Sequence, residues 1–365
     1  MPIVPFIDIV PIGPAGSGKT CLLAAMKQGL DTYSPDAVPV LSADPTTTLR
    51  LDHTWGGVRA DGSGWPAATD RDAWAELCFE AGCDDGEPLY EVRLVDYDGS
   101  CVTVDGHPVS RTLAARVRRA DAVLCVLDGA RVAALLDGDR AFFDHTMSGV
   151  WKLAAGRGKV VRFVVTKWDL LEGRATLAQV RDALVGVPGF VAAARRSSGW
   201  RKAPGSVGLI PVSVVGEEPG RQAVVPLLSV LAPVLQVAAE RARRTGRGGS
   251  AAAEVGVNWL AQAVTAEAVR RVLHRLVGEV PDGRGARRYA GHAAVGASML
   301  VEAAVRTWSD RALRPADGQA ARARSLRRAA EAYQWELDGF RRRFPASALH
   351  GVVSSLPTPL RRRVG

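Results

Sequence analysis

The segment GPAGSGKT, Gly13–Thr20, constrains the fold of this chain more than any other stretch. It follows the apolar run Ile7–Ile12 and precedes Cys21–Leu30, whose apolar residues recur at helical spacing. It matches G-x-x-x-x-G-K-[ST] at every fixed position, in the strand, loop and helix order that the motif requires. In such a loop, backbone N–H groups surround a phosphate, Lys19 meets the β- and γ-phosphates and Thr20 offers its hydroxyl to Mg²⁺. The alternative, a glycine-rich turn that only caps a helix, is disfavoured by the Lys-Thr pair and the preceding strand.

Apolar runs bounded by turn residues predict further strands. They lie at Ala73–Ala81, Tyr90–Tyr97, Asp121–Leu127, Val160–Val165 and Leu209–Val214, with a short strand at Val38–Leu41. Helices are predicted from Asp44-Pro45 onward and at Val109–Arg119, Phe142–Ala155 and Val224–Arg244, the last with a kink at Pro233. The first two runs suit strands joined by a turn. Val160–Val165 is apolar except for Arg162, which suits a parallel strand with both faces covered.

The second strand of the predicted hairpin ends in DYDG, Asp96–Gly99, about 75 residues after the phosphate loop. A nucleotide hydrolase needs a carboxylate at this place for the water shell of Mg²⁺, and a glycine N–H for the γ-phosphate. D-x-x-G alone is common and often marks an ordinary turn at the end of a strand. Its position behind a phosphate loop makes the functional interpretation the favoured one.

The run Val160–Val165 leads into TKWD, Thr166–Asp169. A carboxylate at Asp169 can accept from both N1–H and N2–H₂ of guanine, an edge that adenine lacks, while the stem of Lys167 lies over the base. The alternative is a strand end whose Asp caps the next helix. The last predicted strand ends in PVSV, near Ser213.

Together, GPAGSGKT, DYDG, TKWD and PVSV make residues 3–244 resemble the Ras-like, translation-factor-related class of GTPases. Thr166 stands where this class usually has Asn. The long insert before DYDG, with W-P-x-x-T ahead of the hairpin, is similar to poorly characterised bacterial GTPase domains of that class. The resemblance implies a P-loop NTPase fold, in which three α/β/α layers surround a mostly parallel sheet, with GTP or GDP and Mg²⁺ as cofactors.

By this resemblance, residues of all four motifs are expected to contact a guanine nucleotide. They are Gly13, Pro14, Ala15, Gly16, Ser17, Gly18, Lys19, Thr20 and Cys21 in the phosphate loop, Gly99 at the γ-phosphate, and Thr166, Lys167, Asp169, Ser213 and Val214 around the base. Mg²⁺ is expected at Thr20, Asp96 and a switch threonine, Thr69. Lys19 and Thr69 are the expected catalytic residues.

Two assignments that the resemblance implies stay open: the switch threonine and the residue that orients the attacking water. Thr69 lies 27 residues before Asp96 and directly before the hairpin, whereas Thr46–Thr48 lie about 50 residues before Asp96. We favour Thr69 as the switch threonine, with Thr46–Thr48 as the alternative. After Gly99, hydrolytic members of the class often carry a water-orienting Gln, but this chain has Ser100. Hydrolysis is therefore expected to be slow, or to be completed by a residue supplied elsewhere.

The balance of charge changes near residue 240. Residues 240–365 hold 23 Lys and Arg against 11 Asp and Glu, whereas residues 1–239 hold 24 against 27. The segment TGRGGS, where the balance changes, has the composition of a flexible linker. We therefore expect a GTPase domain over residues 1–244, a linker over 245–250, an α-helical domain over 251–345 and a basic tail over 346–365.

The C-terminal region predicts a helical stripe and a basic surface. Apolar residues alternate by four and three at Leu326, Ala330, Tyr333, Leu337, Phe340 and Phe344. The stripe suits the core of a small helical bundle, or a helix that pairs with a protein partner or a second copy. Arg341–Arg343 and Arg361–Arg363 suit solvated helix faces better than a nucleic acid or anionic membrane partner, because no nucleic-acid-reading motif accompanies them.

Composition favours a cytoplasmic protein. The chain is 47% hydrophobic, none of its five cysteines forms a C-x-x-C pair, and the start MPIVPFIDIV has no basic leader segment. We expect a GTPase that hydrolyses GTP slowly and acts as a nucleotide-dependent switch. The alternative is a GTP-binding interaction protein with negligible hydrolysis. An ATPase is disfavoured, because TKWD would have no role in it.

Overall fold

The computed structural model describes the chain in blocks. They cover residues 6–32, 41–59, 74–82, 88–103, 108–155, 159–198, 208–215, 219–247, 316–349 and 352. The chain divides into two compact units: Val4–Val237 with Leu326–Gly365, and Met1–Ile3 with Ala238–Ser325. The β-sheet and the candidate site lie in the first of these, which we call the sheet unit.

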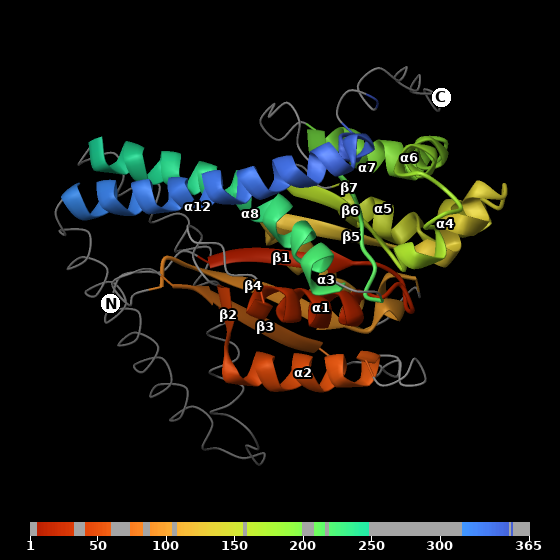
Figure 1. Cartoon of the computed structure of the whole chain (residues 1–365), viewed down its shortest axis with the longest axis horizontal. Coiled ribbons are helices and arrows are strands. Elements are labelled where there is room, and N and C mark those ends of the chain that lie inside the picture. Colours follow the sequence, from red (N-terminus) through yellow and green to blue (C-terminus); the bar gives the residue numbers. More distant parts are fainter. Residues whose placement is uncertain are drawn as a thin grey trace, which may run out of the picture. The chain divides into compact units, whose positions relative to one another are not determined.

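A seven-stranded sheet forms the centre of the sheet unit (Figure 1). Its strands are β1 (Phe6–Ile12), β2 (Leu41–Ala43), β3 (Trp74–Ala81), β4 (Tyr90–Tyr97), β5 (Ala122–Asp128), β6 (Val160–Thr166) and β7 (Leu209–Pro211). The order is β2-β3-β4-β1-β5-β6-β7, with the β2–β3 and β3–β4 pairs antiparallel and the rest parallel. β1 lies between β4 and β5, so its carboxyl end is the place where an open α/β sheet binds ligands. The predicted α/β class and hairpin are confirmed.

Helices follow most strands of the sheet. They are α1 (Lys19–Thr32), α2 (Pro45–Arg59), α3 (Pro108–Arg119), α4 (Gly129–Leu136), α5 (Ser148–Ala154), α6 (Leu177–Val185), α7 (Pro188–Ser198), α8 (Pro219–Arg247) and α12 (Ala316–Arg343). The sequence patterns predicted neither α4 nor α6 nor α7, because helices of 8 to 11 residues are too short for a clear apolar period. The capping box of Thr176 and Gln179 marks the start of α6 and was the available signal.

One face of the sheet is covered by α3, α4, α5, α6 and α7 around an aromatic centre. Phe163 of β6 and Phe190 of α7 are fully buried, with ring centroids 4.5 Å apart. Trp151 of α5 packs against both and donates its indole N–H to the carbonyl of Phe143, at 3.0 Å. The only polar atom of this indole ring is therefore satisfied inside the core.

On the opposite face of β6, a buried arginine contacts α8. Arg162 is 7% exposed and donates from Nε and Nη2 to the carbonyl of Ser229, at 3.2 and 3.0 Å. In a regular helix this carbonyl would accept from the N–H of residue 233, but Pro233 has none. Arg162 therefore replaces the hydrogen bond that Pro233 removes, and α8 continues across the proline.

The apolar composition of α8 also follows from burial. Among the described residues, one single helix segment, Gln222–Arg243, has the length and hydropathy of a membrane span. However, 72% of its most apolar window is buried inside the protein. The core helix of a folded domain meets the same criterion.

The C-terminal helix α12 requires a correction to the expected domain boundaries. We expected a linker at 245–250, but α8 continues through Arg247. We also expected the stripe of α12 to form a separate helical domain, whereas Leu326–Gly365 belongs to the sheet unit. The stripe residue Tyr333 is buried there, and its hydroxyl lies 2.5 Å from that of Tyr90 on β4. The apolar stripe therefore completes the sheet unit, while most of the expected domain, residues 251–315, lies outside the described residues.

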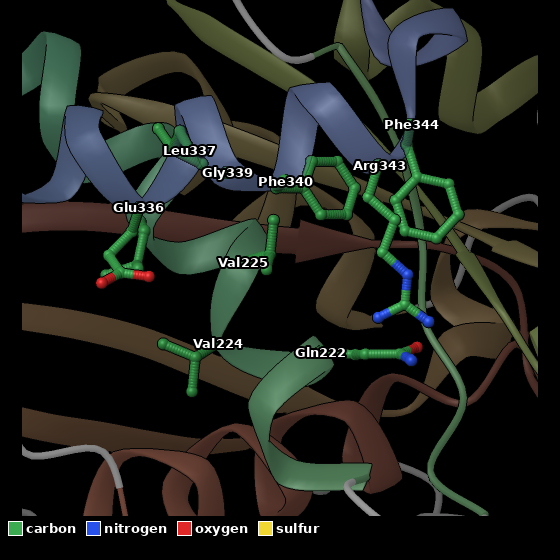
Figure 2. Close-up of a pocket in the computed structure, with 10 residues that line it drawn as sticks. Gln222, Val224, Val225, Glu336, Leu337, Gly339, Phe340, Arg343 and Phe344 are labelled. Atoms are coloured by element: carbon green, nitrogen blue, oxygen red, sulfur yellow. The ribbon is translucent and has the colours of Figure 1, made fainter.

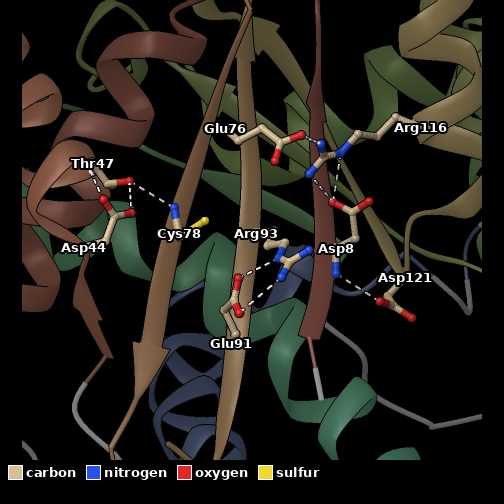
Figure 3. Close-up of polar contacts among 9 residues, drawn as sticks. All are labelled: Asp8, Asp44, Thr47, Glu76, Cys78, Glu91, Arg93, Arg116 and Asp121. Atoms are coloured by element: carbon tan, nitrogen blue, oxygen red, sulfur yellow. Dashed lines mark hydrogen bonds and ion pairs between the residues drawn. The ribbon is translucent and has the colours of Figure 1, made fainter. Parts of the chain in front are cut away.

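A polar network joins β1, β3 and α3 at the end of β1 away from the phosphate loop (Figure 3). Arg116 of α3 donates from Nη2 to Oδ1 of Asp8, at 2.9 Å, and pairs with Glu76 of β3. Burial raises the pKa of Asp8, and the Arg116 charge opposes that shift. The Asp8 N–H donates to Asp121 at 3.0 Å. Because these groups satisfy one another, we assign the network a structural role.

Candidate functional site

The phosphate loop links the carboxyl end of β1 to the start of α1. Gly16 and Gly18 have φ angles of 75° and 85°, in the left-handed region that favours glycine. Gly13 lies so close to the Val126 carbonyl that a Cβ there would approach it to 2.8 Å. The Ser17 hydroxyl is buried and has no hydrogen-bond partner among the described residues. A tightly turned loop with an unsatisfied buried hydroxyl suits a ligand that accepts hydrogen bonds.

Lys19 lies folded over this loop. Its Nζ donates to the carbonyls of Gly13 and Pro14, at 2.9 and 3.1 Å, and lies 5.2 Å from the centroid of the Tyr97 ring. The side chain is nearly inaccessible, and burial lowers its pKa to about 8, although the charge of Asp96 opposes this shift. Among the described residues, the hydrogen-bond partners of this buried cation are two carbonyls, so it is well placed to bind an anion.

Thr20 and Asp96 meet beside Lys19. The Thr20 hydroxyl donates to Oδ1 of Asp96 at 3.0 Å, and Arg50 of α2 donates to Oδ2 at 3.2 Å. The Asp96 side chain is fully buried. A hydroxyl beside a carboxylate is the kind of oxygen donor set that Mg²⁺ prefers, so these residues fit the expected ion. Sequence reasoning missed Arg50, because no motif marks an arginine in the insert before the hairpin.

Gly99 and Ser100 bring the DYDG turn against the phosphate loop. A Cβ on Gly99 would collide with the backbone of Pro14 and Ala15, so only glycine allows this approach. Asp98 accepts from the Ser100 N–H at 3.0 Å and also from the Ser100 hydroxyl. Ser100, which occupies the position of the missing glutamine, thus donates its hydroxyl hydrogen bond to Asp98 within the same turn.

The TKWD motif, Thr166–Asp169, also contacts the phosphate loop. The Thr166 hydroxyl lies 2.7 Å from the carbonyl of Ser17 and 3.1 Å from that of Leu127. Lys167 has a φ of 52°, and its Nζ donates to the carbonyl of Gly16 at 3.1 Å. Thr166 therefore connects the phosphate loop to strand β5. The GTPase class that the sequence resembles usually has Asn at this position.

Asp169 and Ser213 come together from different strand ends. Asp169 lies in the short helical turn Trp168–Leu170 after β6, and the Ser213 hydroxyl after β7 lies 2.9 Å from its Oδ1. The Val215 N–H donates to the same hydroxyl at 3.1 Å. The Ser213 hydroxyl therefore lies between one carboxylate oxygen of Asp169 and the backbone of Val215, whose carbonyl is 2.7 Å away. Cys21 is half-buried near Lys167, and its pKa is raised mainly by burial.

Two further residues support TKWD and were not among the predicted site residues. Asp128 ends β5, and its Oδ2 accepts from Nζ of Lys167 at 3.0 Å, while its Oδ1 accepts from the Ala130 N–H at 2.9 Å. A Cβ on Gly129 would approach the carbonyls of Thr166 and Lys167 to 2.5 and 2.6 Å. The Asp-Gly pair after a buried strand was the sequence signal that could have identified them.

The structure assigns local roles to the threonines of α2. Asp44 caps α2 by accepting from the N–H groups of Thr46 and Thr47, at 2.9 and 3.0 Å. Figure 3 shows Asp44 beside Thr47. The Thr47 hydroxyl donates to Asp44 at 2.6 Å and accepts from the Cys78 N–H of β3 at 3.0 Å. Thr47 therefore joins α2 to the sheet. Thr69 lies outside the described residues, so its role as the switch threonine stays a prediction.

No protein-family model and no curated protein matches this chain. Among solved structures, it is similar to the Ski7 GTPase-like domain of S. cerevisiae bound to GTP, with 13% identity and a TM-score of 0.35, covering 61% of this chain and 44% of that one. It is also similar to a variant of S. thermophilus NFeoB bound to mGDP, with 13% identity and a TM-score of 0.30, covering 60% and 59%. The chain thus spans less than two thirds of either protein. Similarities this low carry no inference about binding, which has to rest on the site.

Proposed function

We propose that this chain binds GTP with Mg²⁺, hydrolyses it slowly and acts as a nucleotide-dependent switch. The observation that carries the proposal is the convergence of two groups of residues on one loop. Lys19, Thr20 and Asp96 meet where β1 and β4 end. On the other side, Thr166 and Lys167 contact the loop carbonyls of Ser17 and Gly16. The spacing of a nucleotide, with phosphates at one end and a base at the other, suits this arrangement.

The phosphate end uses the cation and the oxygen donors. Lys19 would exchange its loop carbonyls for phosphate oxygens, which are better partners for a buried charge. Thr20 and Asp96, with Thr69, would hold Mg²⁺, which when bound neutralises charge on the phosphate oxygens. We expect Lys19→Ala to abolish tight binding of GTP with Mg²⁺.

The base end would select guanine through Asp169. Its carboxylate can accept two hydrogen bonds from the N1–H and N2–H₂ edge, each worth roughly 1.5–3 kcal/mol. Adenine has no matching donor pair and would leave the carboxylate facing an acceptor. The Ser213 hydroxyl, 2.9 Å from Oδ1 of Asp169, supports the orientation of the carboxylate. This arrangement favours GTP over ATP.

Competition titrations of labelled GDP with GTP, ATP and XTP test the assignment. We expect GTP to compete at least about a thousandfold better than ATP. Asp169→Asn should weaken GTP binding and improve XTP binding, because the amide can donate to the second carbonyl of xanthine. The exposed Glu172→Gln in the same loop is the matched control and should change neither affinity. Equal displacement by ATP and GTP in the unmodified protein would overturn the guanine assignment.

A second candidate is a GTP-binding interaction protein with negligible hydrolysis. The contact between Ser100 and Asp98 favours it, because that hydroxyl is not free to orient a water molecule. Multiple-turnover phosphate release separates the two candidates. We expect a rate on the order of 10⁻⁴ to 10⁻² s⁻¹ for a slow GTPase without a partner. No release above background, with tight GTP binding intact, would favour the interaction protein.

A further inference from the structure

A cavity lies between α8 and α12 within the sheet unit, apart from the nucleotide site. It has a volume of about 350 Å³, which falls in the range of small-molecule sites, roughly 300–1,000 Å³. Its lining residues come from α8 and the C-terminal end of α12: Gln222, Val224, Val225, Leu228, Glu336, Leu337, Gly339, Phe340, Arg343 and Phe344 (Figure 2). All of them belong to the same compact unit.

The middle of this cavity is apolar, and its ends are polar. Val225, Leu337 and Phe340 lie between the two helices, and the rings of Phe340 and Phe344 have centroids 4.9 Å apart. Arg343 points from α12 toward Gln222 in the first turn of α8, as Figure 2 shows. A body with apolar surface therefore suits the middle, and a hydrogen-bonding group suits the Arg343 end.

Three polar side chains at the rim of the cavity lack a hydrogen-bond partner within the described part of the chain. Among the described residues, Gln222, Glu336 and Arg343 have no hydrogen bond or ion pair, and Arg343 contacts only the ring of Phe344. Elsewhere on α12, Arg327 pairs with Glu331 and Arg341 pairs with Asp338. Arg343 is exposed at the polar end of the cavity, and a guanidinium with no ion pair can anchor an anionic group there.

The two charges give the cavity a direction. Glu336 and Arg343 are seven residues apart on α12, about 10 Å along the helix axis. An anion is attracted to the Arg343 end and repelled from the Glu336 end. The three arginines in the last turn of α12 also offset the negative end of its helix dipole.

Gly339 keeps the wall of the cavity open. Glycine is the least favourable residue inside a helix after proline, and Gly339 lies within the 28-residue helix α12. A Cβ at this position would meet only Nη2 of Arg342, at 3.8 Å, so packing of the protein does not require glycine here. A small residue here leaves room for a ligand to lie against the helix backbone.

We propose that this cavity binds a small molecule with an apolar body and one anionic group, held by Arg343. Anilinonaphthalene sulfonate, an aromatic anion, is a suitable fluorescent probe for the full chain. We expect saturable binding at one site, displaced by dodecanoate and not by dodecylammonium. Arg343→Gln should weaken binding about 10- to 100-fold, and Arg342→Gln, on an exposed neighbour outside the cavity, should leave it unchanged.

Gly339 supplies a second test that does not depend on charge. Gly339→Leu should abolish probe binding by filling the cavity, whereas Gly339→Ala should keep it, with circular dichroism verifying the fold of each variant. If Gly339→Leu fails to fold, the comparison of Arg343→Gln with Arg342→Gln still tests the proposal. Absence of saturable binding, equal displacement by the two competitors, or unchanged binding in Arg343→Gln would each overturn the proposal.

Discussion

At the scale of single residues, the protonation of Lys19 links the proposed nucleotide site to pH. Its pKa of about 8 lies below the ordinary value of 10.5 because the side chain is buried. Near neutral pH it is a cation held by two carbonyls of its own loop. Phosphate oxygens would favour the protonated form and raise this pKa again. Binding is therefore linked to the proton on Lys19.

The affinity for GTP with Mg²⁺ should fall as pH rises through about 8. Below that value Lys19 already carries its proton, but above it binding must be accompanied by proton uptake. The dissociation constant should then increase by up to about tenfold per pH unit. Titrations between about pH 7 and 9 measure this dependence. An affinity that stays constant across this window would contradict it.

Thr47 shows how a buried hydroxyl at one residue can be tested for a structural role. It is 1% exposed and bridges Asp44 to the Cys78 N–H. Thr47→Val keeps the volume but leaves both partners without this bond, so the free energy of unfolding should fall by about 1–3 kcal/mol. Thr46→Val, at an exposed position, should cost less than about 0.5 kcal/mol. Denaturant titrations measure both values, and a large loss of Mg²⁺-dependent GTP binding in a stable Thr47→Val would instead support a switch role.

At the scale of elements, helix α8 depends on a partner in the sheet. Pro233 leaves the Ser229 carbonyl without an intrahelical donor, and Arg162 supplies two. Burial lowers the pKa of Arg162 to about 9, and Arg341 adds to this shift. Arg162 in the apolar strand β6 therefore supplies the hydrogen bonds that Pro233 removes from α8.

This pairing predicts a non-additive effect on stability. Arg162→Leu leaves a buried carbonyl unsatisfied and should lower the free energy of unfolding by about 1–3 kcal/mol. Adding Pro233→Ala restores the N–H that the helix lacks, so the double variant should be more stable than Arg162→Leu alone. Denaturant titrations of the two single variants and the double variant measure the coupling. Purely additive effects would show that the two residues act independently.

At the scale of the whole molecule, the chain leaves the sheet unit at residue 238 and returns to it at residue 326. Leu326–Gly365 belongs to the same compact unit as the sheet, and Tyr333 of α12 meets Tyr90 at the start of β4. The same strand, β4, carries Asp96 next to its other end, at the candidate site. α12 is thus in contact with a strand that carries a proposed Mg²⁺ ligand.

The contact between the two tyrosines predicts that α12 stabilises the sheet unit. Both hydroxyls are buried, so Tyr333→Phe removes the partner of Tyr90 and should cost about 1–3 kcal/mol. The double variant Tyr90→Phe with Tyr333→Phe should cost less than the sum of the single variants, because each single variant already removes the hydrogen bond between the two hydroxyls. Thermal or chemical unfolding of the full chain measures this cycle. Additive costs would mean that the two hydroxyls do not interact.

The sequence by itself determined the local parts of the site. Gly13–Thr20, Asp96–Gly99 and Thr166–Asp169 each lie at the end of an apolar strand. In the sheet, β4 lies next to β1, and only β5 separates β1 from β6. Such motifs can be predicted because their chemistry needs particular residue types at fixed spacing within a few positions. The strands themselves follow from short-range alternation and apolar runs.

Only the tertiary structure decided which distant residues complete these parts. Arg50 contacts Asp96, Asp128 contacts Lys167 and Arg162 contacts the Ser229 carbonyl. No local spacing predicts these pairs, because the packing of distant strands and helices brings them together. The same holds for Leu326–Arg343, whose stripe predicted a helix but not its partner. An amphipathic helix buries its apolar face against whichever surface the rest of the chain leaves open. Here that surface includes Tyr90 of the sheet, and the choice depends on the folded core rather than on the helix sequence.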